Sequence, residues 1–312
     1  MSLNKDHMPD SSPVLLTGAS GYVGGQLLKR LQQSNVRVRC LSRKPERLSC
    51  DQSLAEVVQG DVLDASSIAK AMTGISTAYY LVHSMGYTAD FAEADRRAAG
   101  NFGKAAKEAG VARIVYLGGL GDDNDPNLSP HLQSRHEVGR VLRDSGVQTI
   151  EFRSSAVLGA GSLSFELIRS LTDRLPVMIC PRWLSTPTQP IAVSDLTDYL
   201  AEALNLATDN SRVFEIGGCD VVTYGELIQE YARQRGLRRW LISVPVLTPY
   251  LSGLWLGLVT PKTAEVGRHL VEGLRNPTVV TDNSALQAFA IKPMGIQPAI
   301  KLALASLNEP QC

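Results

Sequence analysis

The sequence lacks several features that mark particular classes of protein. Its 312 residues include five cysteines, an odd number without a C-x-x-C pair, so we expect reduced thiols in a cytoplasmic protein, not a disulfide framework or a zinc site. The five histidines show no metal-ligand spacing, so no metal is expected. Basic and acidic residues balance at 31 each, and this zero net charge argues against a nucleic-acid partner.

Long apolar runs are also lacking. Residues 1–12 are polar and contain no signal-peptide core, so we expect a disordered lead-in. The most apolar stretch, Val244–Thr260, is shorter than the roughly 20 residues of a membrane-spanning helix, and Pro245 and Pro249 interrupt it. We therefore expect no transmembrane segment. A buried helix or a wall of a substrate lobe is the favoured interpretation, and peripheral membrane contact is the alternative.

Short β-branched runs alternate with longer amphipathic stretches from residue 13 to residue 153. The expected strands are Val14–Thr17, Val36–Leu41, Ala55–Gln59, Thr77–Val82, Arg113–Leu117 and Gln148–Phe152. The expected helices are Tyr22–Leu31, Ser66–Met72, Phe91–Ala109 and Gln133–Asp144. This alternation predicts an α/β fold of the Rossmann type, a doubly wound parallel sheet with helices on both faces.

The pattern changes after Gly159, where four prolines interrupt residues 175–191. We expect a helix over Ser194–Leu206, a strand over Arg212–Ile216 and mostly helices beyond Thr223. The predicted organisation is a dinucleotide-binding domain over 13–160, a smaller, interleaved and mostly helical C-terminal lobe over 161–306, and a tail over 307–312. Within the lobe, 191–218 would return to the main sheet.

A glycine-rich loop follows the first expected strand. Its glycines stand at 18, 21 and 24, in the pattern G-x-x-G-x-x-G. Gly18 permits a sharp turn, Gly21 lets a pyrophosphate approach the backbone, and Gly24 lets the following helix pack closely. The rest of the loop comprises Ser20, Tyr22 and Val23, where the helix N-terminus offers N–H groups to phosphates. The loop predicts a dinucleotide site, and a glycine-rich turn without a ligand is the alternative.

The end of the second strand indicates which dinucleotide is preferred. Enzymes that use NAD typically place an acidic residue there for the ribose 2′-hydroxyl, whereas this sequence has Ser42 and Arg43. A guanidinium can bind a 2′-phosphate through two hydrogen bonds, and a serine hydroxyl adds another donor. We therefore expect NADP(H) in preference to NAD(H), with a solvated basic turn as the alternative.

Further cofactor contacts are expected at the ends of the third and fourth strands. Asp61 can accept a hydrogen bond from the adenine amino group while Val62 packs on the ring. Val82 and His83 would border the nicotinamide ribose, because ligands lie outside the carboxyl ends of the strands. The alternatives are that Asp61 caps a helix, although Asp64 is better placed for that role, and that His83 is an ordinary loop residue.

Several of these segments together resemble the atypical short-chain dehydrogenase/reductase superfamily, in its NmrA-like branch. They are Thr17–Gly24, Leu41–Arg43, Gly60–Val62 and Ile114–Leu117, and the later stretches Thr188–Asp195 and Val244–Pro261 are similar to bacterial NAD(P)-binding members. The resemblance covers about residues 13–305, although the first third holds the most specific motifs. It implies an NAD(P)-binding Rossmann-type fold.

The resemblance also implies a catalytic pattern that this sequence lacks. The superfamily carries Tyr-x-x-x-Lys in the helix after the fifth strand, preceded by Ser or Thr at that strand's exit. This sequence has no hydroxyl residue over Leu117–Gly121, and the best spacing match is His131-x-x-x-Arg135. His131 could act as an acid, and Arg135 could hold the ribose or a phosphate. The alternative is that Pro130 and His131 begin a helix whose wet face carries Arg135 and His136.

Two functions follow from these features. The first is a reductase that transfers hydride from NADPH to a carbonyl or quinone-like small-molecule substrate without the usual Ser-Tyr-Lys triad. The second is a non-catalytic NADPH-binding protein, either a redox sensor or an assembly subunit with a protein partner. A nucleotide-sugar epimerase or dehydratase is less favoured, because those reactions normally use the tyrosine–lysine pair.

Overall fold

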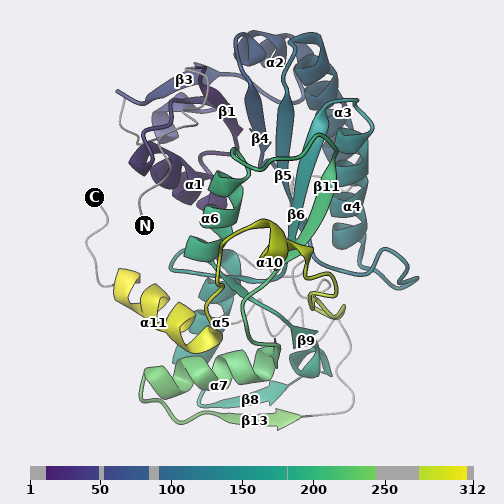
Figure 1. Cartoon of the computed structure of the whole chain (residues 1–312). Helices are drawn as coiled ribbons and strands as arrows, with labels where there is room; N and C mark the ends of the chain where they lie inside the picture. The colour runs from purple at the N-terminus through teal and green to yellow at the C-terminus, as the bar shows by residue number, and fades with distance from the viewer. Residues whose placement is uncertain (1–11, 49–52, 84–90, 181, 244–273, 308–312) are drawn as a thin grey trace.

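A seven-stranded sheet forms the centre of the computed structural model, which describes residues 12–48, 53–83, 91–180, 182–243 and 274–307 (Figure 1). The order across the sheet is β11-β6-β5-β4-β1-β2-β3, and every neighbouring pair is parallel. The strands are β1 (Val14–Thr17), β2 (Val38–Ser42), β3 (Ala55–Gln59), β4 (Thr77–Tyr80), β5 (Arg113–Gly119), β6 (Gln148–Ser154) and β11 (Arg212–Ile216). The predicted Rossmann-type fold is confirmed.

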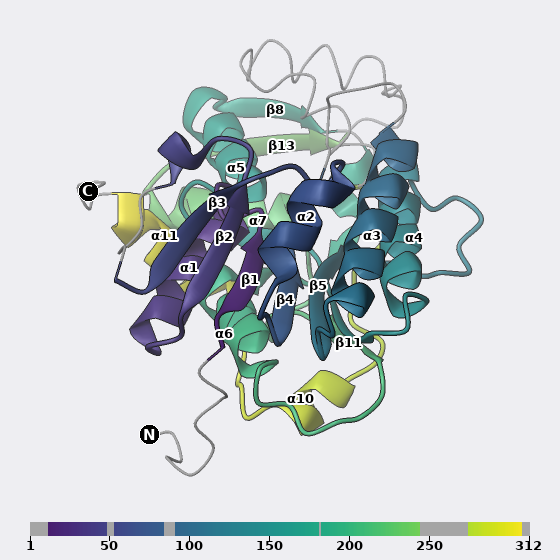
Figure 2. The same ribbon diagram turned by 90° about the horizontal axis from the view of Figure 1, so that it is seen from above.

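Helices cover both faces of this sheet (Figure 2). The helices α1 (Tyr22–Gln33) and α6 (Val193–Glu202) lie on one face, and α2 (Ala65–Met72), α3 (Phe91–Glu108) and α4 (Pro130–Arg143) lie on the other. Successive strand residues point to opposite faces, so Leu16 joins the core beside α1 while Leu15 joins the core beside α2 and α3. Burial on both faces explains why the strands read as nearly continuous apolar runs.

Four aromatic rings complete the core on the α1 and α6 face. Phe152, Tyr199 and Phe214 come from β6, α6 and β11, and Phe289 follows the short helix α10 (Ser284–Ala288). Their neighbouring ring centroids lie 5.2–6.0 Å apart. A late segment of the chain is therefore built into the core of the central sheet.

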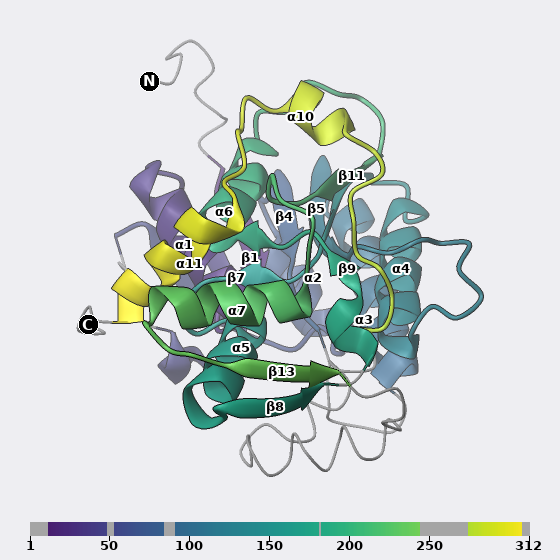
Figure 3. The ribbon, with the colours of Figure 1, turned by 90° about the horizontal axis from the view of Figure 1, so that it is seen from below.

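A second group of elements lies below the sheet in Figure 1, and Figure 3 shows α7 running across it beside the ribbon of β13 and β8. The helices are α5 (Leu163–Arg174), α7 (Tyr224–Gln234) and α11 (Ile296–Leu307). The short strand pairs are β8 (Val177–Cys180) with β13 (Trp240–Ser243), β7 (Val157–Leu158) with β10 (Ile191–Ala192), and β9 (Pro187–Thr188) with β12 (Val222–Thr223). Two 3₁₀ turns, η1 (Pro45–Arg47) and η2 (Arg182–Ser185), complete the elements of the described residues. The lower helices share a third apolar core.

Several element boundaries differ from the sequence predictions for local physical reasons. Strands β5 and β6 each continue two residues further, because they pair with each other through Gly119 and Ser154. Helix α4 begins at Pro130, where the Ser129 hydroxyl accepts the N–H of Leu132 and caps the helix. Val244–Thr260 lies outside the described residues. Among the residues that are described, we find no helix long and apolar enough to cross a membrane.

Candidate functional site

The glycine loop lies between the carboxyl ends of β1 and β4. Gly18 has a positive φ of 76°, and a Cβ there would stand 2.5 Å from the carbonyl oxygen of Leu81. A Cβ on Gly24 would stand 2.7 Å from the carbonyl carbon of Gly18 and closer still to its oxygen. The loop therefore touches the exit of β4, and α1 packs directly on the loop, which only glycine at both positions allows.

The same loop offers what a pyrophosphate requires. Gly21 is the N-cap of α1, no side chain caps the helix, and its first turn contains no acidic residue. The N–H groups of Tyr22, Val23 and Gly24 belong to this first turn, where a helix has no internal acceptors for them. A Cβ on Gly21 would meet only the Gly18 carbonyl oxygen, at 3.2 Å, and Ser20 and Gly21 are exposed. These residues fit a bound dinucleotide phosphate.

Tyr22 extends from the loop to the segment that leads into α5. Its hydroxyl and ring lie against Gly159 and Gly161, where a Cβ would contact the tyrosine side chain. Burial raises the pKa of Tyr22 to about 12, and the charge of Glu166 in the first turn of α5 adds to the shift. The tyrosine therefore stays neutral at physiological pH and joins the cofactor loop to the lower part of the molecule.

The residues proposed for the adenosine half stand at the ends of β2 and β3. Arg43 is exposed just beyond β2, and the buried Ser42 hydroxyl accepts the N–H of Lys44 at 3.2 Å. The carboxylate of Asp61 accepts the N–H of Leu63 at 2.9 Å. Helix α2 is capped by Asp64, whose carboxylate accepts the N–H of Ser66. Val62 is buried in the apolar core on the same face of the sheet as Ile68, so one side of it serves packing.

A buried polar cluster stands beyond the end of β4. Nδ1 of His83 lies 3.2 Å from a carboxylate oxygen of Asp95 in α3, and Asp95 is only 3% exposed. The ring of His83 lies 4.8 Å from that of His131, measured between centroids. Ser134 donates to the same Asp95 oxygen at 3.5 Å. Val82 precedes the cluster and packs half-buried against the core.

The surroundings of His83 disfavour its charged form. Burial lowers the pKa of His83, the hydrogen bond to Asp95 opposes that shift, and the charge of Arg135 adds to it. Nε2 of His83 is buried and has no hydrogen-bond partner among the described residues. Thus Nδ1 of His83 is engaged by Asp95, whereas Nε2 makes no hydrogen bond to the described residues.

Arg135 faces β5 instead of water. Its guanidinium donates to the carbonyl of Leu117 and lies 5.2 Å from the ring centre of Tyr116, whose hydroxyl donates to the Arg135 carbonyl at 2.9 Å. His136 is 5% exposed and lies 3.0 Å from the Gly119 carbonyl oxygen. The alternative that places both side chains on a wet helix face is therefore wrong.

An ion network beneath these residues was not predicted. Glu151 is fully buried on β6 and pairs with Arg143 of α4 and with Arg153, the latter at 2.8 Å. Arg153 continues to Asp123 at 2.8 Å, and Asp123 lies 2.6 Å from Nδ1 of His136. The network fastens the loop after β5 to α4 and β6, next to the candidate site. A buried charge must be paired, which explains why these five residues cluster.

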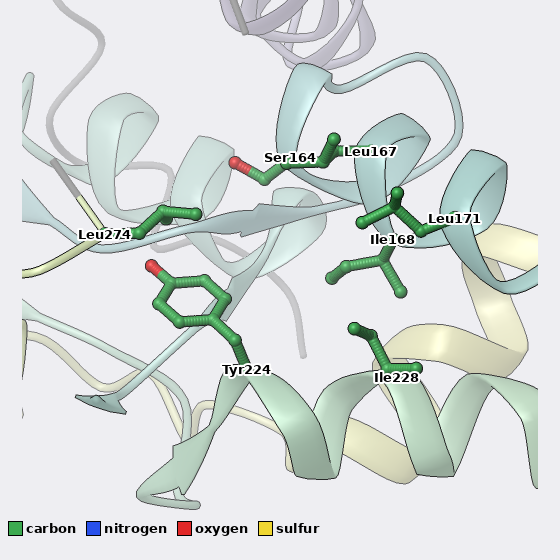
Figure 4. A pocket seen from close by; sticks show the side chains of 7 residues that line it. All are labelled: Ser164, Leu167, Ile168, Leu171, Tyr224, Ile228 and Leu274. Carbon is green, nitrogen blue, oxygen red and sulfur yellow. The ribbon is translucent and has the colours of Figure 1, made fainter. Parts of the chain in front are cut away.

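The lower part of the molecule contains a small apolar pocket between α5 and α7 (Figure 4). The residues that line it are Ser164, Leu167, Ile168, Leu171, Tyr224, Ile228 and Leu274. Near it, the Ser155 hydroxyl lies 2.6 Å from those of Thr188 and Thr278. Burial raises the pKa of Tyr224, although hydrogen bonds to Thr188 and Thr278 act in the opposite direction. Among the described residues, no cluster of His, Cys, Asp or Glu side chains is arranged to hold a metal.

Asp95 is a further residue of the site that was not predicted. A signal was present, because Asp95 falls on the stripe of α3 that also carries Ala98, Ala99 and Phe102, all buried. A carboxylate at the spacing of core residues needs a buried partner. That partner, His83, was predicted as a site residue but only for contact with the ribose.

Comparisons with known proteins concern the family and the fold of the chain. A family model described as NAD(P)H-binding matches residues 18–157. A reductase of Streptomyces griseus named for a (4-alkanoyl-5-oxo-2,5-dihydrofuran-3-yl)methyl phosphate is 30% identical over 231 residues, which cover 72% of this chain and 74% of the relative.

Solved structures match nearly the whole chain. A nucleoside-diphosphate-sugar epimerase of Staphylococcus aureus has a TM-score of 0.74 at 17% identity, covering 93% of this chain and 99% of the other. The triphenylmethane reductase of Citrobacter sp., in complex with NADP(H), has a TM-score of 0.71 at 17% identity, with the same coverage. These likenesses concern the fold. Together with the glycine loop and the Streptomyces reductase, they establish that the chain belongs to the atypical short-chain dehydrogenase/reductase superfamily and carries its NAD(P)H-binding domain.

Proposed function

We propose that this chain is an NADPH-dependent reductase that passes hydride to a carbonyl or quinone-like acceptor, and that it belongs to the NmrA-like branch and works in the cytoplasm. The observation that carries the proposal is the His83–Asp95 pair beside the glycine loop, where a reduction requires a proton. The reductases among the similar proteins support the reaction class.

In this proposal, residues 13–160 hold the cofactor and 161–306 hold the acceptor. The pyrophosphate binds to the backbone of Gly18, Ser20, Gly21, Tyr22, Val23 and Gly24. Ser42 and Arg43 bind the 2′-phosphate, which favours NADP(H) over NAD(H). Asp61 and Val62 contact the adenine, and Val82 and His83 border the nicotinamide ribose.

Bound NADPH supplies the hydride. The chain itself positions the acceptor, keeps water away and provides a proton. The sequence assigned the proton to His131 and a holding role to Arg135, which in the fold donates to the Leu117 carbonyl. His131 stands next to His83, so two imidazoles serve this edge of the site.

The pocket between α5 and α7 supports a neutral, apolar acceptor. Its described lining holds no charged side chain and only two hydroxyls, those of Ser164 and Tyr224 (Figure 4). The Streptomyces relative is named for a phosphate ester, which would require a cation. A hydrophobic aldehyde, ketone or quinone therefore fits this chain better than a phosphorylated one.

A binding protein without turnover is the second candidate. The engagement of Arg135 with Leu117 favours it, because the position that matches the superfamily's lysine is occupied by a structural hydrogen bond. A redox sensor or an assembly subunit would need the cofactor loop alone. Tight NADPH binding without reduction of any acceptor would select this candidate.

The NADPH preference is tested with Arg43→Ala. Loss of charge-assisted hydrogen bonds worth about 1.5–3 kcal/mol weakens NADPH binding roughly 10-fold to 100-fold and leaves NADH binding within about twofold. Fluorescence titration with both nucleotides measures this, and Arg47→Ala, an exposed arginine in the neighbouring turn η1, is the matched control. An equal loss for both nucleotides would remove the 2′-phosphate role.

Turnover is tested by following NADPH oxidation with panels of hydrophobic aldehydes, ketones and quinones. Steady oxidation with at least one of them is the expected result. Failure of the whole panel, with NADPH still bound tightly, would contradict the reductase and leave the binding protein.

A further inference from the structure

Building on the proposed reductase, we propose that His83, not His131, delivers the proton, and that Asp95 is the positioning residue that orients His83. The sequence pointed to His131 because it occupies the spacing of the missing tyrosine. The contacts within the fold point instead to its neighbour.

The orientation of His83 follows from its partner. An ionised carboxylate only accepts hydrogen bonds, so Nδ1 of His83, 3.2 Å from Asp95, carries the hydrogen. Nε2 is then the nitrogen that reacts, and it is buried without a partner among the described residues. Asp95 comes from α3 and is buried among core residues, which fixes the imidazole in one orientation. A carboxylate that holds Nδ1 and leaves Nε2 to react is a recurring arrangement in proton-transfer sites.

The place of His83 matches this role. It lies two residues beyond Leu81, whose carbonyl the glycine loop touches at Gly18. The loop and His83 therefore share the point where the strand order reverses between β1 and β4. In parallel α/β sheets the ligand lies in the crevice outside that point.

Among the described residues, the charged and titratable groups around His83 come from four elements. Asp95 of α3 favours the protonated imidazole, whereas Arg135 of α4 and burial disfavour it. His131, also from α4, contributes its ring, and Tyr80 of β4 and Tyr116 of β5 are buried with raised pKa values. The protonated form of His83 thus depends on Asp95, and acid favours it.

With a carbonyl acceptor, hydride transfer to carbon and proton transfer to oxygen together complete the reduction. The carbonyl carbon takes the two electrons and one hydrogen of a hydride from NADPH, and the carbonyl oxygen takes a proton from Nε2 of protonated His83. The products are an alcohol, NADP⁺ and a neutral imidazole, which solvent reprotonates.

The test compares His83→Gln, His131→Gln and Asp95→Asn, with Glu137→Gln as the control. Glu137 is a partly exposed carboxylate on α4. Its substitution makes the same change from carboxylate to amide as Asp95→Asn, but it does not alter the partner of His83. We expect kcat to fall about 100-fold or more in His83→Gln, roughly tenfold or more in Asp95→Asn, and less in His131→Gln than in His83→Gln. NADPH affinity is expected to change less than threefold in Asp95→Asn.

Two readouts separate positioning from a merely structural role. In the wild type, kcat for reduction rises as the pH falls through the pKa of His83, and Asp95→Asn moves this rise to lower pH. NMR titration of isotope-labelled histidine in the resting protein should show the same downward shift of the His83 pKa, without any turnover. Circular dichroism verifies that each variant is folded.

The outcomes are distinct. Full kcat in folded His83→Gln, or an unchanged His83 pKa in Asp95→Asn, would overturn the inference while leaving the reductase intact. A larger loss in His131→Gln than in His83→Gln would return the proton to His131. Absence of turnover in the wild type with every acceptor would contradict the proposed function, and the inference with it.

Discussion

Replacing Gly24 with alanine tests the close contact between α1 and the cofactor loop. The new Cβ would stand 2.7 Å from the Gly18 carbonyl carbon and 3.0 Å from Cα of Ala19. These are backbone atoms of the loop, so no rotation of a side chain relieves the contact. Gly25, the next residue, offers a matched control, because a Cβ there meets nothing closer than the Ala19 carbonyl oxygen at 3.4 Å.

The two substitutions share one energy term and differ in another. Each gains up to about 1 kcal/mol of helix propensity when alanine replaces glycine in α1. Only Gly24→Ala pays for overpacking, which typically costs about 1–3 kcal/mol. We therefore expect the Gly25→Ala variant to be slightly more stable than the wild type. The Gly24→Ala variant should be less stable than the Gly25→Ala variant by about 1–3 kcal/mol, and each kcal/mol lowers the melting temperature by roughly 2–4 °C.

Thermal unfolding and NADPH fluorescence titration on both variants measure these effects. Because Gly24→Ala displaces the phosphate-binding backbone, its NADPH affinity should fall at least about tenfold, whereas Gly25→Ala should bind within about twofold of the wild type. Equal melting temperatures and equal affinities for the two variants would refute the packing argument. A lower melting temperature with full NADPH affinity would refute the assignment of the loop to the phosphates.

Two further predictions concern the buried ion network. Gly139→Ala should destabilise the protein by about 1–3 kcal/mol in urea unfolding, because its Cβ would stand 2.6 Å from the Glu151 carboxyl carbon. The control Gly100→Ala, on the open face of α3, should be neutral or stabilising. Equal effects of the two substitutions on the free energy of unfolding would contradict the close contact with Glu151. Burial acts to raise the pKa of Asp123, but hydrogen bonding to Arg153 and its charge lower it overall, so this carboxylate contributes stability above about pH 4 that is lost as the pH falls further. Urea midpoints from pH 7 to pH 3 should therefore fall less steeply in Asp123→Asn, and an identical slope would contradict the pairing.

The central sheet was predictable because its signals are local. The strands are short apolar runs buried on both faces, and β1, β3 and β11 have the predicted bounds. The two-residue strands β7, β9, β10 and β12 carry too little pattern to be recognised, and they exist only because neighbouring segments meet. The expected helix Gln133–Asp144 began three residues late, whereas the alternative that starts a helix at Pro130 and His131 matches the N-terminus of α4, where Ser129 is the N-cap and Pro130 the first position.

The candidate site also has a part that local sequence signals predict and a part that depends on contacts between distant segments. Glycine spacing along the chain indicated the phosphate loop, because its contacts are made within a few residues. The pairing of His83 with Asp95, and that of Glu151 with Arg143, join residues from different elements. Sequence spacing cannot specify such pairs. What it shows is a charged residue where an apolar one belongs, and that signal is the one to follow.

The ring of Phe289 in the core has a consequence for biosynthesis. Phe152, on β6, packs against Phe289 at 5.5 Å between ring centroids, although it leaves the ribosome roughly 140 residues earlier. At about 5–20 residues per second, the nascent sheet spends roughly 7–30 s with one aromatic face uncovered. During that interval the growing chain exposes an apolar surface to which chaperones and other nascent chains can bind. Synthesis that stops before residue 289 leaves this surface uncovered.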